Sequence, residues 1–120
     1  MKVLVVEDTE ELRTLFVSLL QYDGYQVESA NNGVQALERL ETFLPDLIIS
    51  DILMPEMDGY ELATIVKEKY PEIKIQLVSC YDDNSHANLV DTNLKENIIY
   101  KPFNSHTLLV KIRKLLDKKQ

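Results

Sequence analysis

Short apolar stretches rich in β-branched residues alternate along the chain with longer stretches in which apolar residues recur every three or four positions. The short stretches are typical of strands, and the longer ones are typical of amphipathic helices. This alternation predicts five strand–helix units arranged around a parallel sheet, which is an α/β fold. The predicted strands are Lys2–Val6, Tyr25–Ser29, Asp46–Ser50, Ile73–Val78 and Asn97–Tyr100.

The helical stretches are delimited by capping residues, glycine and proline. The predicted helices lie between Thr9 and Gly24, between Asn31 and Pro45, between Gly59 and Pro71, around Ser85–Thr92 and around Leu108–Leu116.

The carboxyl ends of parallel strands share one edge of a sheet, and ligands bind there. We therefore look for chemistry at that edge.

Composition narrows the class of protein. The 120 residues are 45% hydrophobic and carry a formal net charge of −7, which fits a single domain over residues 1–120. The acidic balance disfavours direct binding to nucleic acid or to an anionic membrane surface. No stretch approaches the ~20 apolar residues that cross a bilayer, and the single Cys80 cannot form an intrachain disulfide. We therefore expect a reducing, cytoplasmic location.

Polar residues follow the predicted strands. Glu7 and Asp8 come after the first strand, Asp51 after the third, Ser79 after the fourth and Lys101 after the fifth. A single acid at such a place usually caps a helix, but three carboxylates at one edge repel one another unless a cation neutralises them. Mg²⁺ prefers such oxygen ligands, and a lysine and a hydroxyl nearby would bind a phosphoryl group. This pattern predicts phosphoryl transfer onto a carboxylate.

Three motifs resemble those of the receiver domain of two-component response regulators, and the resemblance extends over the whole chain. It implies a flavodoxin-like, doubly wound sheet of order 2-1-3-4-5 with helices on both faces. The motifs are Val5-Val6-Glu7-Asp8, Ser50-Asp51-Ile52-Leu53-Met54-Pro55-Glu56-Met57-Asp58-Gly59 and Lys101-Pro102-Phe103.

The resemblance also implies roles for individual residues. Asp51 would be the phosphoacceptor. Asp8 and Asp51 would bind Mg²⁺ directly, with Mn²⁺ as a substitute, Glu7 would act through water, and Leu53 would offer its backbone carbonyl.

A sensor histidine kinase or a histidine phosphotransfer protein would donate the phosphoryl group, and Lys101 would offset its charge. Ser79 would then move toward the phosphoryl group and rearrange the face made by the fourth helix, the fifth strand and the last helix. The receiver would catalyse both this transfer and its own dephosphorylation, so we expect a signalling module rather than a metabolic enzyme. Output would pass through a partner protein or an output domain outside these residues, or through a phosphorylation-dependent homodimer.

Some residues depart from the usual receiver pattern. Ile98 stands where most receivers have an aromatic switch residue, and Tyr100 has the same strand parity, so Tyr100 is a candidate for a displaced switch. Cys80 follows Ser79 at a position where receiver domains commonly have a small residue.

Two other functions stay open from the residues. A degenerate receiver would bind a partner without phosphorylation; the unusual residues Ile98 and Cys80 favour it, and the intact acids and lysine oppose it. A phosphatase of the haloacid dehalogenase type also uses an aspartate nucleophile with Mg²⁺, but it has a second aspartate two positions on, where this chain has Leu53.

Leu53 and Tyr81 would flank the entrance to the phosphoacceptor. Neither side chain can orient an attacking water as a carboxylate or amide can, so we expect a long-lived phosphoaspartate. Leu53→Asn combined with Tyr81→Glu should speed the loss of phosphate, measured as decay of the phosphorylated species on a phosphate-affinity gel. An unchanged decay rate would contradict this expectation.

Overall fold

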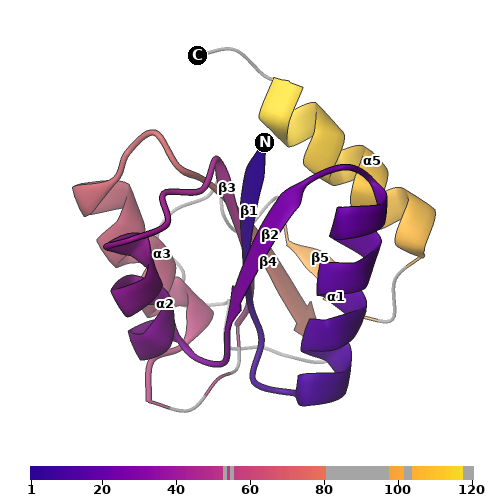
Figure 1. Ribbon diagram of the computed structural model, residues 1–120. Coiled ribbons are helices and arrows are strands. Elements are labelled where there is room, and N and C mark those ends of the chain that lie inside the picture. The colour runs from indigo at the N-terminus through magenta and orange to yellow at the C-terminus, as the bar shows by residue number, and fades with distance from the viewer. Residues whose placement is uncertain (53, 55, 81–97, 102–103, 118–120) are drawn as a thin grey trace.

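The computed structural model describes residues 1–52, 54, 56–80, 98–101 and 104–117. They form a five-stranded parallel sheet of order β2-β1-β3-β4-β5. Helices α1 and α5 cover one face of the sheet, and α2 and α3 cover the other (Figure 1). The elements are β1 (Lys2–Val6), α1 (Glu10–Tyr22), β2 (Gln26–Ala30), α2 (Gly33–Leu40), β3 (Leu47–Asp51), α3 (Gly59–Lys69), β4 (Lys74–Cys80), β5 (Ile99–Lys101) and α5 (Ser105–Asp117).

The α/β class and the sheet order that the resemblance implied are confirmed. The predicted helix around Ser85–Thr92 lies outside the described residues. Strand β1 has the predicted bounds, whereas β2 and β3 begin and end one residue later than expected. Strand β4 begins one residue later and continues to Cys80, and β5 begins two residues later and ends one residue later than expected. Each strand end is set by pairing with its neighbour rather than by the end of the apolar run. Asp51, for example, still pairs with Val78.

Asp51, Ser79 and Lys101 therefore lie within the ends of their strands, not after them as we expected. Ser79 pairs with Tyr100, and Lys101 pairs with Cys80. The correction leaves these residues at the carboxyl edge of the sheet.

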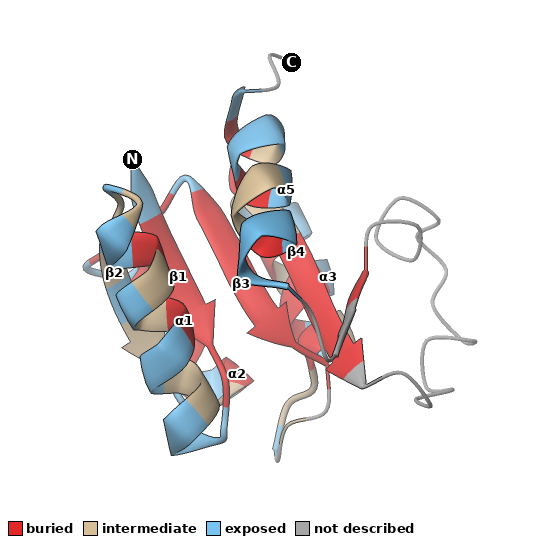
Figure 2. Cartoon of the chain, turned by 90° about the vertical axis from the view of Figure 1, so that its right-hand side faces the viewer, coloured by how far each residue is buried: buried red, intermediate tan, exposed pale blue. Residues whose placement is uncertain are grey.

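Two hydrophobic layers hold the sheet between the helices. Side chains at alternate positions of β1 point to opposite faces, so Val3 and Val5 pack toward α1 and α5, whereas Leu4 and Val6 pack toward α2 and α3. Strands β1, β3 and β4 are largely buried, the edge strand β2 is only partly buried, and the outward sides of α1 and α5 are exposed (Figure 2). Burial on both faces explains the continuous apolar runs of the central strands.

Polar contacts fix the carboxyl-terminal part of α5 at the edge of the sheet where the strands begin. Arg113 forms a bidentate ion pair with Asp23, in the turn after α1, with Nε donating to Oδ2 over 2.9 Å. The Nζ atom of Lys74 donates to the carbonyl oxygen of Leu115 over 2.6 Å. A cation at the last carbonyls of a helix interacts favourably with the negative end of the helix dipole.

Among the described residues, none of the helices has the length and apolar character needed to span a bilayer.

The ion pair predicts a specific pH dependence of stability. Hydrogen bonding to the Arg113 guanidinium holds the pKa of Asp23 below its ordinary value. Ionised Asp23 therefore stabilises the fold above its unfolded-state pKa of about 3.9, and this contribution is lost as the pH falls through the lower folded-state pKa. Asp23→Asn should lower the free energy of unfolding at neutral pH, and its difference from wild type should shrink in acid.

Urea denaturation across this pH range measures the effect. Glu68→Gln is the matched control, because Glu68 is an exposed carboxylate on α3 for which the described part of the structure shows no ion pair. A difference between Asp23→Asn and wild type that stays constant with pH would contradict the account.

Candidate functional site

Three carboxylates meet at the carboxyl ends of β1 and β3. Glu7 and Asp8 directly follow β1, and Asp51 is the last residue of β3. The two strands are neighbours, with Val6 paired to Ser50, and one oxygen atom from each acid lies within 4.8 Å of the others. Glu7 is 1% exposed and Asp51 is 8% exposed, while Asp8 is open to solvent. The sequence prediction that these acids converge is confirmed.

Backbone groups hold Glu7 in place. Its amide donates to the carbonyl oxygen of Ala30 at the end of β2 over 3.1 Å. Its carboxylate Oε2 accepts the amide of Thr9, the residue before α1, over 3.1 Å. The Thr9 side chain makes no capping hydrogen bond. The Glu7 carboxylate instead accepts a backbone amide hydrogen bond at the amino end of this helix.

Asp51 is held by its own strand end and by α3. Its Oδ1 atom accepts the amide of Ile52 over 3.0 Å, which sets the orientation of the carboxylate. The amide of Gly59, the first residue of α3, donates to the carbonyl oxygen of Ile52 over 2.8 Å. The helix begins so close to β3 that a Cβ atom on Gly59 would lie 2.5 Å from the Asp51 carbonyl oxygen. The absence of a side chain at Gly59 is therefore required for this approach.

The donor set fits Mg²⁺. All donors are oxygen atoms, and two of the three carboxylates are buried, where repulsion between unneutralised charges is strong. Two oxygens bound to one Mg²⁺ lie at most about 4.2 Å apart, because each Mg–O bond is about 2.1 Å long. The observed spacing, within 4.8 Å, is close to this limit. A small movement of one side chain, or a water between one carboxylate and the ion, makes up the difference between the two distances.

The other expected site residues lie on the neighbouring strands. Ser79 is buried in β4, one residue beyond Val78, which pairs with Asp51. Lys101 ends β5, and the described part of the structure includes its backbone but not its side chain. Leu53, expected to offer a carbonyl, lies outside the described residues.

The residues at the unusual positions are only partly described. Ile98 is buried and belongs to a hydrophobic cluster with Ile52 and Leu77, so the expected switch position is part of the core. Tyr81 lies outside the described residues, and so do the side chains of Tyr100 and Cys80.

Sequence reasoning missed three contributors to the site. The amide of Ile52 binds the Asp51 carboxylate, and a backbone donor leaves no signal in residue type. Gly59 allows the close approach of α3, and the Asp58-Gly59 pair at a helix start was a visible signal. Arg13 donates to the Glu7 carbonyl oxygen over 2.9 Å, and its position four residues after Thr9, in the first turn of α1, could have been noticed.

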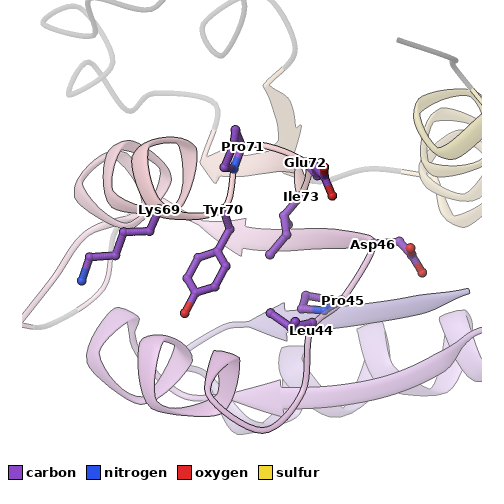
Figure 3. Close-up of a pocket in the computed structure, with 8 residues that line it drawn as sticks. All are labelled: Leu44, Pro45, Asp46, Lys69, Tyr70, Pro71, Glu72 and Ile73. Carbon is purple, nitrogen blue, oxygen red and sulfur yellow. The ribbon is translucent and has the colours of Figure 1, made fainter.

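A cavity of about 410 Å³ lies at the opposite edge of the sheet, where β3 and β4 begin (Figure 3). Its walls include Leu44, Pro45, Tyr70, Pro71 and Ile73. It shares no residue with the acid cluster.

Comparison with known proteins identifies relatives over almost the whole chain. The family described as "Response regulator receiver domain" matches residues 3–113. The sensor kinase CckA of Brucella abortus is 36% identical over 118 residues, which cover 97% of this chain and 12% of that protein. The response regulator receiver protein CpdR of Brucella abortus is 34% identical over 115 residues, which cover 96% of each.

A solved structure agrees with these relatives. The signal receiver domain of a signal transduction histidine kinase from Syntrophus aciditrophicus superposes with a TM-score of 0.82. It is 31% identical and covers 99% of this chain and 94% of that domain. The chain thus spans nearly all of CpdR and of this domain, but only 12% of CckA.

The contact between α3 and β3 predicts the effect of a single methyl group. Gly59→Ala should destabilise the fold by about 1–3 kcal/mol, because the new atom meets backbone that cannot move aside. It should also displace the Asp51 backbone and weaken Mg²⁺ binding. Urea denaturation and Mg²⁺ titration measure the two effects.

Gly33→Ala is the matched control, since Gly33 also begins a helix and its new methyl group would meet the side chain of Met57. The Cβ atom of Met57, 2.9 Å from the new methyl group, does not move with the rotamer, so this substitution should also lower stability. It meets no backbone atom of Asp51, so we expect unchanged Mg²⁺ binding. Equal weakening of Mg²⁺ binding by the two substitutions would contradict the role given to Gly59.

Proposed function

Because this chain belongs to the response regulator receiver family of two-component systems, we propose that Asp51 accepts a phosphoryl group from a phosphohistidine donor in a Mg²⁺-dependent reaction. The observation that carries the proposal is the convergence of three carboxylates, two of them buried, with Asp51 oriented by the Ile52 amide. Buried carboxylates repel one another, so such a cluster favours a bound cation.

The proposed metal site uses oxygen ligands alone. Asp8 and Asp51 would bind Mg²⁺ or Mn²⁺ directly, Glu7 through a water, and Leu53 through its backbone carbonyl. Bound metal would supply the positive charge that neutralises the acids and the phosphoryl oxygens. Receiver domains generally bind Mg²⁺ at an acidic pocket, and the acid cluster is the matching feature here.

In the proposed transfer, a carboxylate oxygen of Asp51 attacks phosphorus. The bond from phosphorus to the donor's imidazole nitrogen breaks as the new oxygen–phosphorus bond forms, and the imidazole leaves with the electron pair. Lys101 would offset charge on the transferring group, and the Ser79 hydroxyl would donate to a phosphoryl oxygen. Attack of water on phosphorus later releases inorganic phosphate and restores the carboxylate.

Receiver domains interact with sensor histidine kinases and with output domains. For this chain the donor would be a sensor histidine kinase or a histidine phosphotransfer protein in the cytoplasm. Phosphorylation would change the surface around β5 and α5, which would then bind an output protein, an output domain or a second copy. The phosphorylated aspartate is a local charge that shifts the equilibrium between two arrangements of this surface.

Incubation with Mg²⁺ and a small-molecule phosphodonor tests the proposal. The wild type should gain one phosphoryl group, seen by intact mass and phosphate-affinity gel, and chelation of Mg²⁺ should prevent the gain. Asp51→Asn should not be modified, because an amide is a poor nucleophile toward phosphorus. Asp46→Asn, at the opposite edge of the sheet, is the control and should be modified like the wild type.

Two results would contradict the proposal. One is equal modification of Asp51→Asn and wild type, which would put the phosphoryl group elsewhere. The other is a wild type that binds Mg²⁺ and stays unmodified, which would favour a phosphorylation-independent binding module.

A further inference from the structure

Arg13 is bonded to both ends of the loop that carries Asp8. This loop consists of residues 7–9 and joins β1 to α1. The Nη1 atom of Arg13 donates to the Glu7 carbonyl oxygen over 2.9 Å, and its backbone amide donates to the Thr9 carbonyl oxygen over 2.9 Å. Since Thr9 also donates to the Glu7 carboxylate, the loop is closed by three hydrogen bonds. Asp8 lies at its centre and is exposed.

We propose that Arg13 is a positioning residue for the acid cluster. Its guanidinium group fixes the carbonyl of Glu7, and through it the direction in which the loop presents the Glu7 and Asp8 carboxylates toward Asp51. The inference rests on the proposed Mg²⁺-dependent function, because it concerns the same three acids. Residues that orient metal ligands typically change metal affinity 10–100-fold when they are removed.

The contacts of Arg13 favour a positioning role over a simple charge role. Its side chain is half-buried and bonds to a backbone carbonyl. In the described part of the chain it forms no ion pair with a carboxylate. Within these described residues its charge therefore neutralises no acid by direct contact. The planar guanidinium instead provides a donor in a fixed direction, which the flexible ammonium group of lysine does not.

The two roles predict opposite changes in Mg²⁺ affinity. If Arg13 acts only as a positive charge beside a cation site, then removing it reduces repulsion and Mg²⁺ binds more tightly. If Arg13 positions the loop, removing it lets the ligands separate and Mg²⁺ binds more weakly. The sign of the change therefore distinguishes the two.

Mg²⁺ titration followed by calorimetry or by amide NMR shifts provides the test. Arg13→Met keeps an apolar stem of similar length and removes both donors and charge; it should weaken Mg²⁺ binding about tenfold. Arg13→Lys should weaken it less. Arg39→Met is the control, since exposed Arg39 on α2 makes a surface ion pair with Glu28 at 3.7 Å, and it should bind Mg²⁺ like the wild type.

A readout without metal separates positioning from general stability. In the absence of Mg²⁺, Arg13→Met should show faster amide hydrogen exchange at Asp8 and Thr9, with exchange in β4 unchanged. With the phosphodonor, it should need about tenfold more Mg²⁺ for half-maximal phosphorylation and reach nearly the wild-type rate at saturation. If Arg13→Met does not fold, the same measurements on Arg13→Lys and Arg13→Gln decide the question.

Failure of this inference differs from failure of the proposed function. A wild type that neither binds Mg²⁺ nor becomes phosphorylated at Asp51 would overturn the proposed function, and the inference with it. A wild type that does both, together with an Arg13→Met variant that binds Mg²⁺ equally or more tightly, would overturn the inference alone.

Discussion

The parallel pairing of β1 with β3 is the constraint on which the site depends. Because Val6 pairs with Ser50, the residues after β1 and the last residue of β3 come together at one edge of the sheet. A shift of one residue in this register would turn every side chain of a strand to the opposite face. The two hydrophobic layers on either side of the sheet prevent such a shift, since each buries its own set of side chains from the same strands. Packing of the core thus determines where the charges lie.

Gathering three carboxylates in this way is unfavourable, and the structure offsets the cost with nearby donors. The amides of Thr9 and Ile52 bind two of the carboxylates, and the amino ends of α1 and α3 lie close to the cluster. The positive end of a helix dipole favours negative charge there. These backbone groups reduce the repulsion between the carboxylates. The ion pair between Arg113 and Asp23 lies near the opposite edge of the sheet, so it stabilises α5 without touching the site.

Much of this arrangement could be predicted from the sequence. The unbroken apolar run before Glu7 defined β1 and its end, and the acids after it indicated the edge where the carboxylates gather. Sheet order came from the resemblance to receiver domains, because periodicity does not specify which strands are neighbours. The ends of β3 and β4 were misplaced, since Asp51 and Ser79 are polar residues that join a strand through pairing with a neighbour. The Arg13 contact depends on the side chain reaching from the first turn of α1 to the Glu7 carbonyl oxygen, which residue type alone does not encode.

We propose that the converging carboxylates make Asp51 a phosphoacceptor. Chemical trapping tests it most directly: borohydride reduces an acyl phosphate to an alcohol, which converts a phosphorylated aspartate into homoserine. After incubation with Mg²⁺ and a phosphodonor, peptide mass spectrometry should find homoserine at position 51 and unmodified aspartate in samples treated with chelator. Homoserine at another position, or none at position 51 in a sample that carries a phosphoryl group, would contradict the account.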